Sequence, residues 1–206
     1  MRQLVVLATG LLCAWTASAQ PGLQERLKVV QVDPAQRALA VDAGRKASFF
    51  CANCHGETGL GKTPEVPNLA GQNPAYLLEQ IRKFGSGERK DPFMQGLIKV
   101  LKDDERLNIA LFYANAKVPP GKADVVQAAR GKVLFEKLCV RCHGAEGHGN
   151  ETIPRLAGQQ VPYLIKSVTR YRDQSGERNS QAMAIATSGL KNDEIAALAH
   201  YIAMLP

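Results

Sequence analysis

The chain has 206 residues, of which 45% are hydrophobic and 22% charged, and its formal net charge is +7. This length allows one large domain or two small ones, and the composition is that of a folded globular protein. The positive charge is spread along the chain, and no basic run carries interleaved aromatic residues, which argues against nucleic acid as a partner. A mildly cationic docking surface and a plain solvated surface both fit this charge.

The N-terminus has the pattern of an export signal. Arg2 precedes an apolar run from Leu4 to Trp15, and Ala17-Ser18-Ala19 forms a small-x-small cleavage site. This pattern predicts a signal peptide over residues 1–19, cleavage after Ala19 and a periplasmic location. The alternative is an uncleaved membrane anchor, but the apolar run is shorter than the roughly 20 residues that a spanning helix needs.

Residues 20–38 form an extension that has no counterpart later in the chain. Its apolar residues recur at a helical spacing of four and three, at Leu23, Leu27 and Val30. We expect a short helix here that lies on the first domain. Asp33 and Pro34 then have the types of an N-cap and a first helical residue, which predicts a second helix leading towards Cys51.

One short motif occurs twice, as C-x-x-C-H at residues 51–55 and again at residues 139–143. The motif is typical of covalent attachment of a c-type haem. Two thiols on one helical turn can form thioethers to one edge of the porphyrin, and the histidine that follows can reach the iron. The motifs predict haem attachment at Cys51, Cys54, Cys139 and Cys142, with proximal iron ligands at His55 and His143.

The cysteine count supports this interpretation. Removal of the signal peptide takes Cys13 with it, so all four remaining cysteines belong to the two motifs and none is left for a structural disulfide. The alternative is a zinc ion held by the two cysteine pairs. That alternative leaves a histidine directly after each pair unexplained.

An internal repeat determines the expected architecture. Cys51 pairs with Cys139 at an offset of 88, and a Leu-Ala-Gly-Gln run at residues 69–72 recurs at an offset of 87. A Ser-Gly-Glu-Arg run at residues 86–89 recurs at an offset of 89. The chain is therefore expected to be a duplicated domain. Its expected parts are a first domain over residues 39–116, a Pro/Gly/Lys-rich linker over 117–124 and a second domain over 125–206.

Each copy is expected to contain three helices joined by long loops. The expected helices cover residues 42–51, 76–84 and 103–114 in the first copy, and 128–138, 163–171 and 192–204 in the second. Asp103 and Asn192 are expected to cap the last helix of each copy. No stretch shows the alternation of a strand with hairpin turns, so the predicted fold class is all-α.

The repeat also suggests the sixth ligand of each iron. Met94 lies 39 residues after His55, and Met183 lies 40 residues after His143. A lone methionine is often soft core filling, but two at matched repeat positions favour ligation of iron. We therefore expect Met94 and Met183 to be the distal ligands.

Three other residues of ligating type have a weaker case. Met204 aligns with Asn115 and is expected to lie in the core of the last helix. His148 lies only five residues after His143, too near to cross to the other face of the same haem. His148 and His200 align with leucines and are expected to be structural or surface residues.

With these motifs in order, each half resembles a class I cytochrome c, and the whole chain resembles dihaem cytochromes of the c4 type. The resemblance implies two tandem class I cytochrome c-like domains with one covalent haem each, close to their interface. It also implies that the carbonyl groups of Pro67 and Pro154 accept a hydrogen bond from the proximal histidines. Arg89 and Arg178 are candidates for pairing with haem propionates, with a solvated surface role as the alternative.

One departure from the repeat concerns the helix before each motif. Gly44 lies seven residues before Cys51, whereas Gly131 lies eight residues before Cys139. The first helix is therefore expected to contact the last helix differently in the first domain.

The predicted function is electron transfer between respiratory redox partners. Two haems with both axial positions filled can exchange electrons without binding substrate. The resemblance implies a terminal oxidase as the acceptor, a quinol-oxidising complex or a periplasmic dehydrogenase as the donor, and peripheral contact with a membrane complex. The alternatives are a cytochrome subunit of a dehydrogenase that oxidises sulfur compounds or alcohols, and a dihaem peroxidase. Peroxidase chemistry needs an open distal position, which matched methionine ligands argue against.

Overall fold

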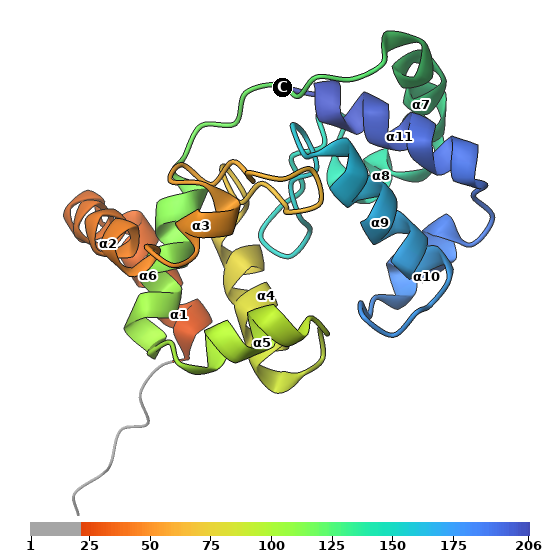
Figure 1. Cartoon of the computed structure of the whole chain (residues 1–206). Helices are drawn as coiled ribbons and strands as arrows, with labels where there is room; N and C mark the ends of the chain where they lie inside the picture. Colours follow the sequence, from red (N-terminus) through yellow and green to blue (C-terminus); the bar gives the residue numbers. More distant parts are fainter. Residues whose placement is uncertain (1–21) are drawn as a thin grey trace, which may run out of the picture.

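The computed structural model describes residues 22–206, so the predicted signal peptide lies outside the described residues (Figure 1). Within residues 22–206 the chain forms eleven α-helices and no β-strand, which confirms the all-α prediction. None of these helices is both long and apolar enough to cross a membrane.

The helices form two sets that lie side by side and are joined by an extended segment (Figure 1). The first set is α1 (Leu23–Val32), α2 (Pro34–Ala47), α3 (Ala52–His55), α4 (Pro74–Ser86), α5 (Pro92–Lys99) and α6 (Asp103–Ala114). The second set is α7 (Val125–Leu138), α8 (Val140–His143), α9 (Val161–Arg172), α10 (Gln181–Thr187) and α11 (Asn192–Met204). We call the first set together with its loops the first copy, and the second set with its loops the second copy.

Helix α2 begins where the sequence signals predict, but the N-caps of α6 and α11 lie one residue before the predicted positions. Asp33 caps α2 by accepting hydrogen bonds from two backbone N–H groups, and Pro34 is the first helical residue, as predicted. Asp103 and Asn192 are wrong as N-caps, because each is the first residue inside its helix. The caps are lysines, whose backbone N–H groups donate to the carboxylates of Glu105 and Glu194 at 2.8 Å. These carboxylates lie three residues after the cap, where they can reach back to it.

Each copy has its own apolar core. In the first copy, residues of α4 and α6 pack around Leu27 of α1, which is 1% exposed. The N-terminal extension therefore completes this core, as expected for a helix that lies on the first domain. In the second copy Phe135 of α7, which is fully buried, packs with residues of α9 and α11.

A close helix crossing is the same in both copies. A Cβ atom at Gly44 would lie 2.0 Å from the carbonyl oxygen of Asn108 on α6, and one at Gly131 would lie 2.0 Å from that of Ala197 on α11. Asn108 and Ala197 occupy matched repeat positions, so the expected difference in helix contact is wrong. The one-residue difference falls after the crossing, because α2 ends at Ala47 whereas α7 continues to Leu138.

The prediction for Met204 is also wrong. Its side chain is 41% exposed, while Ala203 and Leu205 on either side are buried. Met204 therefore lies at the surface, and its two neighbours in the chain lie in the core. His200 is structural, as expected, because its Nδ1 accepts a hydrogen bond from the backbone N–H of Asp124 at 3.0 Å.

The loops after the two C-x-x-C-H motifs face each other between the copies (Figure 1). Gln72 donates to the carbonyl oxygen of Arg155 at 2.8 Å and accepts from its backbone N–H at 2.7 Å. Gln159 makes the same pair of bonds with Asn68, at 2.9 and 2.7 Å. Because each glutamine occupies the matched repeat position of the other, these bonds join the copies with near-twofold symmetry.

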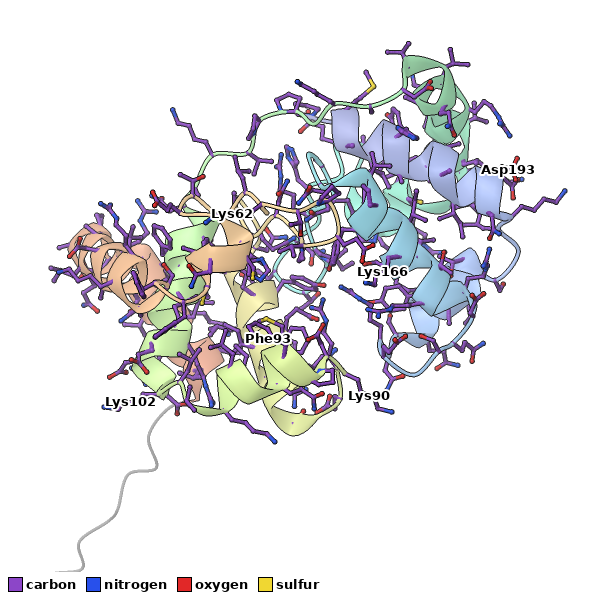
Figure 2. All side chains as sticks on the ribbon, in the orientation of Figure 1. Lys62, Lys90, Phe93, Lys102, Lys166 and Asp193 are labelled. Atoms are coloured by element: carbon purple, nitrogen blue, oxygen red, sulfur yellow. The ribbon has the colours of Figure 1, made fainter. Side chains whose placement is uncertain are left out.

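The connecting segment is held against both copies. Gly71 and Gly158 sit at matched positions, and both leave room for the side chain of Val118, which a Cβ atom at either glycine would approach to 2.5 Å. An ion pair adds a further contact between the copies, because Lys166 on α9 reaches Glu65 at 2.7 Å. Lys166 is labelled in Figure 2.

Candidate haem sites

The two C-x-x-C-H motifs fold into the same local structure. In both, the last four residues form a single helical turn, α3 or α8, that begins directly after the first cysteine. This turn closes through a bond from the histidine N–H to the carbonyl oxygen of the first cysteine, at 2.8 Å for His55 and 2.9 Å for His143. All four cysteines are free thiols, with Cys54 and Cys142 exposed and Cys51 and Cys139 half-buried. The thiols of one motif are therefore available to the same edge of a porphyrin.

The proximal histidines are buried and oriented. His55 and His143 are 7% and 5% exposed. Their Nδ1 atoms lie 3.0 Å from the carbonyl oxygen of Pro67 and 3.1 Å from that of Pro154. These are the bonds that the resemblance implied, and they assign the proton to Nδ1 because a carbonyl oxygen only accepts. The Nε2 atom of each ring is then a free lone pair for iron.

Burial sets the protonation of both histidines and of the thiols. Burial lowers the pKa of His55 and His143, although the bond to the proline carbonyl opposes this effect. The neutral imidazole, which is the form that ligates iron, is therefore favoured. Burial also raises the pKa of Cys51, and together with Cys142 it raises the pKa of Cys139 to about 11.

Met94 and Met183 lie on two short helices, α5 and α10, in segments that were predicted to be loops. In both helices the methionine is the third residue, and its backbone N–H donates to the side chain of the N-cap. Met94 donates to Asp91 at 3.0 Å, and Met183 donates to Ser180 at 3.4 Å. The pair Asp91-Pro92, an N-cap before a helix-starting proline, is a sequence signal that predicts α5.

Arginine and tyrosine side chains gather between the copies. Arg178 is 8% exposed and donates to the hydroxyl groups of Tyr163 and Tyr171. Arg89, from the first copy, donates to the same hydroxyl of Tyr163 at 3.3 Å. Two guanidinium groups from opposite copies thus converge on one phenol. Neither forms an ion pair with a carboxylate among the described residues.

This cluster is strongly cationic. Burial alone would raise the pKa of Tyr163, but Arg178 and Arg89 lower it to about 7. A buried cation is stable in a protein only when an anion or several hydrogen bonds compensate it. For Arg178 this excludes the solvated surface role that the sequence left open, and the propionates of a haem are anions of the required kind.

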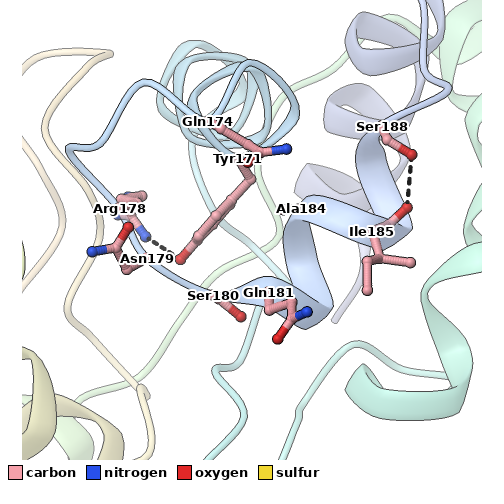
Figure 3. A pocket seen from close by; sticks show the side chains of 9 residues that line it. All are labelled: Tyr171, Gln174, Arg178, Asn179, Ser180, Gln181, Ala184, Ile185 and Ser188. Carbon is pink, nitrogen blue, oxygen red and sulfur yellow. Dashed lines mark hydrogen bonds between the residues drawn. The ribbon is translucent and has the colours of Figure 1, made fainter.

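A cavity of about 760 Å³ opens beside Arg178 (Figure 3). Tyr171, the loop around Arg178 and one face of α10, including Ala184 and Ile185, form its walls. Met183 is not part of this wall, because it lies on another face of α10. The cavity therefore borders α10 but not the side chain of Met183.

The donor set fits haem better than zinc. Among residues 22–206, no group of three or more His, Cys, Asp or Glu side chains is placed to hold a metal ion. Such a group is what the zinc alternative requires. Paired free thiols, an oriented neutral imidazole and a buried cationic cluster are the groups that would hold a haem by its vinyl edge, its iron and its propionates.

Comparison with known proteins agrees with this chemistry. The family model for cytochrome c matches residues 128–206. Cytochrome c4 of Pseudomonas aeruginosa is 33% identical over 78% of this chain and 86% of its own length. The thiosulfate dehydrogenase electron acceptor of Stutzerimonas stutzeri is 27% identical over 84% of this chain and 87% of its own length.

A solved structure gives the same result for the fold. The crystal structure of reduced cytochrome c4 from Pseudomonas stutzeri superposes with a TM-score of 0.75 and 30% identity, over 81% of this chain and 98% of that chain. It contains two cytochrome c domains, which confirms the predicted pair of class I cytochrome c-like domains. The spacing of the two cysteine pairs fits two covalently bound haems c. The chain therefore belongs to the cytochrome c4 family of dihaem, electron-carrying cytochromes.

Proposed function

We propose that His55 and Met94 ligate the first haem iron, that His143 and Met183 ligate the second, and that the chain carries electrons through these sites in the periplasm. Cys51 and Cys54 would hold the first haem, and Cys139 and Cys142 the second. The observation that carries this proposal is the matched setting of the two methionines. Each is the third residue of a short helix and is fixed by its N-cap side chain.

The roles of the side chains follow from their chemistry. When bound, haem supplies a one-electron Fe(III)/Fe(II) couple. The bonds from His55 and His143 to proline carbonyl groups keep each imidazole in the tautomer that presents Nε2. Methionine sulfur is a weak donor that favours Fe(II), so Met94 and Met183 would raise the reduction potentials. With both axial positions held by side chains, peroxide has no free site, which disfavours the peroxidase alternative.

We assign the two haems to domains over residues 39–116 and 125–206, with residues 117–124 as the linker. Separate apolar cores on either side of the linker support this division. A periplasmic location is supported by the signal-like pattern over residues 1–19 and by the two haem-attachment motifs. Sequencing of the mature N-terminus tests it, because cleavage after Ala19 gives a chain that starts at Gln20.

The proposed partners are a terminal oxidase as electron acceptor and a quinol-oxidising complex or periplasmic dehydrogenase as donor. The similarity to a thiosulfate dehydrogenase electron acceptor supports a dehydrogenase as one donor. Reduced protein should restore oxygen uptake to washed membranes of the native source that contain the oxidase. Reduction of the oxidised protein by purified thiosulfate dehydrogenase and thiosulfate separates the second role from the first.

Substitution of the methionines tests the ligands. Oxidised wild-type protein should show the weak near-infrared sulfur-to-iron band of two haems. Met94→Ala should remove half of that band and lower the reduction potential of one haem, and Met183→Ala should do the same to the other. Met204→Ala is the matched control, because Met204 is exposed and should leave the band and both potentials unchanged. An unchanged band in Met94→Ala would refute the assignment of that ligand.

A further inference from the structure

The proline carbonyl group that orients each proximal histidine belongs to a peptide group held by the other copy. The carbonyl oxygen of Pro154, which lies 3.1 Å from His143 Nδ1, shares its peptide group with the backbone N–H of Arg155. That N–H donates to Oε1 of Gln72, a residue of the first copy, at 2.7 Å. The Nε2 atom of Gln72 donates to the carbonyl oxygen of Arg155 at 2.8 Å, so the side-chain amide is held at both ends.

The matched bonds run in the opposite direction. The carbonyl oxygen of Pro67, 3.0 Å from His55 Nδ1, shares its peptide group with the backbone N–H of Asn68. This N–H donates to Oε1 of Gln159, a residue of the second copy, at 2.7 Å. Gln159 donates back to the carbonyl oxygen of Asn68 at 2.9 Å. Each proximal histidine is therefore linked to a glutamine of the other copy through a single peptide group.

A peptide group transmits the effect of one hydrogen bond to the other. Its C–N bond has partial double-bond character, so an acceptor at the N–H favours the form with more negative charge on the oxygen. The oxygen then accepts a stronger bond from the imidazole, because hydrogen bonds in a chain strengthen one another by roughly 10–30%. A stronger bond at Nδ1 makes the imidazole a more basic ligand at Nε2. Gln72 and Gln159 are 7% and 8% exposed, so little water competes for these bonds.

We infer that Gln72 is a positioning residue for His143, the proposed proximal ligand of the second haem. Gln159 has the same role for His55 and the first haem. The inference rests on the proposed ligation of iron by these histidines. Each glutamine fixes the peptide group that orients the imidazole, and it increases the electron donation of the imidazole to iron. More donation favours Fe(III), so each copy lowers the reduction potential of the haem in the other copy.

The test is Gln72→Ala in the haem-loaded full chain, followed by spectroelectrochemical titration. The midpoint potential of the second haem, the one displaced by Met183→Ala, should rise, while that of the first haem stays in place. The rise should be smaller than the fall in Met183→Ala, because Gln72 acts on the iron through two successive hydrogen bonds. Gln159→Ala should give the crossed result, a rise for the first haem only. If Gln72→Ala does not load two haems, Gln72→Leu, which fills the space without an amide, takes its place.

Asn73→Ala is the matched control. Asn73 follows Gln72 in the same loop, and its Nδ2 donates to three backbone carbonyl oxygens of the second copy, those of His148, Asn150 and Ile153. None of these groups belongs to the peptide group between Pro154 and Arg155. The control therefore loosens the same contact and should leave both midpoints unchanged. Unchanged midpoints in Gln72→Ala, an equal rise in Asn73→Ala, or equal shifts of both haems in one variant would overturn the inference.

Proton NMR of the reduced protein supplies an independent readout. In Gln72→Ala the Nδ1–H proton of His143 should move upfield, because its bond to the carbonyl oxygen of Pro154 is weaker, while that of His55 stays in place. An unchanged His143 signal contradicts the inference. Haem content distinguishes this failure from failure of the proposed function. Two haems per chain with an intact sulfur-to-iron band, but no crossed shift, would reject only the role of the glutamines.

Discussion

The bonds between the copies offer a direct test of how the two haem domains are held together. Gln72 is 7% exposed, and its amide makes one accepted and one donated bond to the backbone of Arg155. Gln72→Ala removes both bonds at once. A net contribution of about 0.5–1.5 kcal/mol for each bond predicts a loss of about 1–3 kcal/mol in the free energy of unfolding. The loss should lie near the upper end, because the part-buried N–H and C=O of Arg155 both lose their partner.

Guanidinium unfolding of the haem-loaded protein, followed by circular dichroism, measures this loss. Gln159→Ala should cost a similar amount, because Gln159 is 8% exposed and makes the equivalent pair of bonds to Asn68. Gln24→Ala is the control, since Gln24 is exposed and makes one bond to a backbone carbonyl in its own copy. A loss below about 0.5 kcal/mol in Gln72→Ala would refute the reasoning, because it would place these bonds at the strength of an ordinary surface contact.

Two further predictions concern packing and charge. Gly131→Ala places a Cβ atom 2.0 Å from the carbonyl oxygen of Ala197, so the free energy of unfolding, measured by denaturation, should fall by about 2–3 kcal/mol. Gly189→Ala is the control, because Gly189 has open space around it and its substitution should leave the free energy of unfolding unchanged. The bond and charge of Lys166 lower the pKa of Glu65 in the folded state, so the pair stabilises the protein above the ordinary pKa of a glutamate and ceases to do so as the pH falls through the folded value. Glu65→Gln should therefore destabilise the protein at pH 7 and low salt but not at pH 3 or high salt, and equal effects in all conditions would contradict an electrostatic role.

The proposed haem-binding residues could be identified from the sequence because the motif and the repeat constrain each other. The C-x-x-C-H spacing places its two cysteines and its histidine on one helical turn, and the structure forms that turn in both copies. The repeat then singled out Met94 and Met183, which the structure places at equivalent helix positions. The helices that carry them were missed because α5 and α10 are only 8 and 7 residues long. Segments of that length show little periodicity, so their start signals at Asp91 and Ser180 carry the information.

The prediction of different helix crossings was wrong because a shift along the sequence need not change how two helices pack. The one-residue difference between Gly44 and Gly131 predicted different helix crossings, yet both glycines meet the same place on the last helix. A helix crossing is fixed by the close approach of two backbones, so the extra residue is accommodated where the chain is free to change. In the first copy that place is the turn before Cys51, where Phe49 and Phe50 are 70% and 68% exposed.

The duplication therefore preserves the proposed ligands and changes what surrounds them. The bonds that orient the histidines, seat the methionines and join the copies recur at matched positions. At other matched positions the copies differ, because Ile202 takes the place of Tyr113 and Arg178 is buried where its counterpart Arg89 is only half-buried. Haem potentials depend on burial and hydrogen bonding as well as on ligand identity. Two sites with the same proposed axial ligands, one histidine and one methionine each, can thus differ in potential, and a difference in potential gives electron transfer between them a direction.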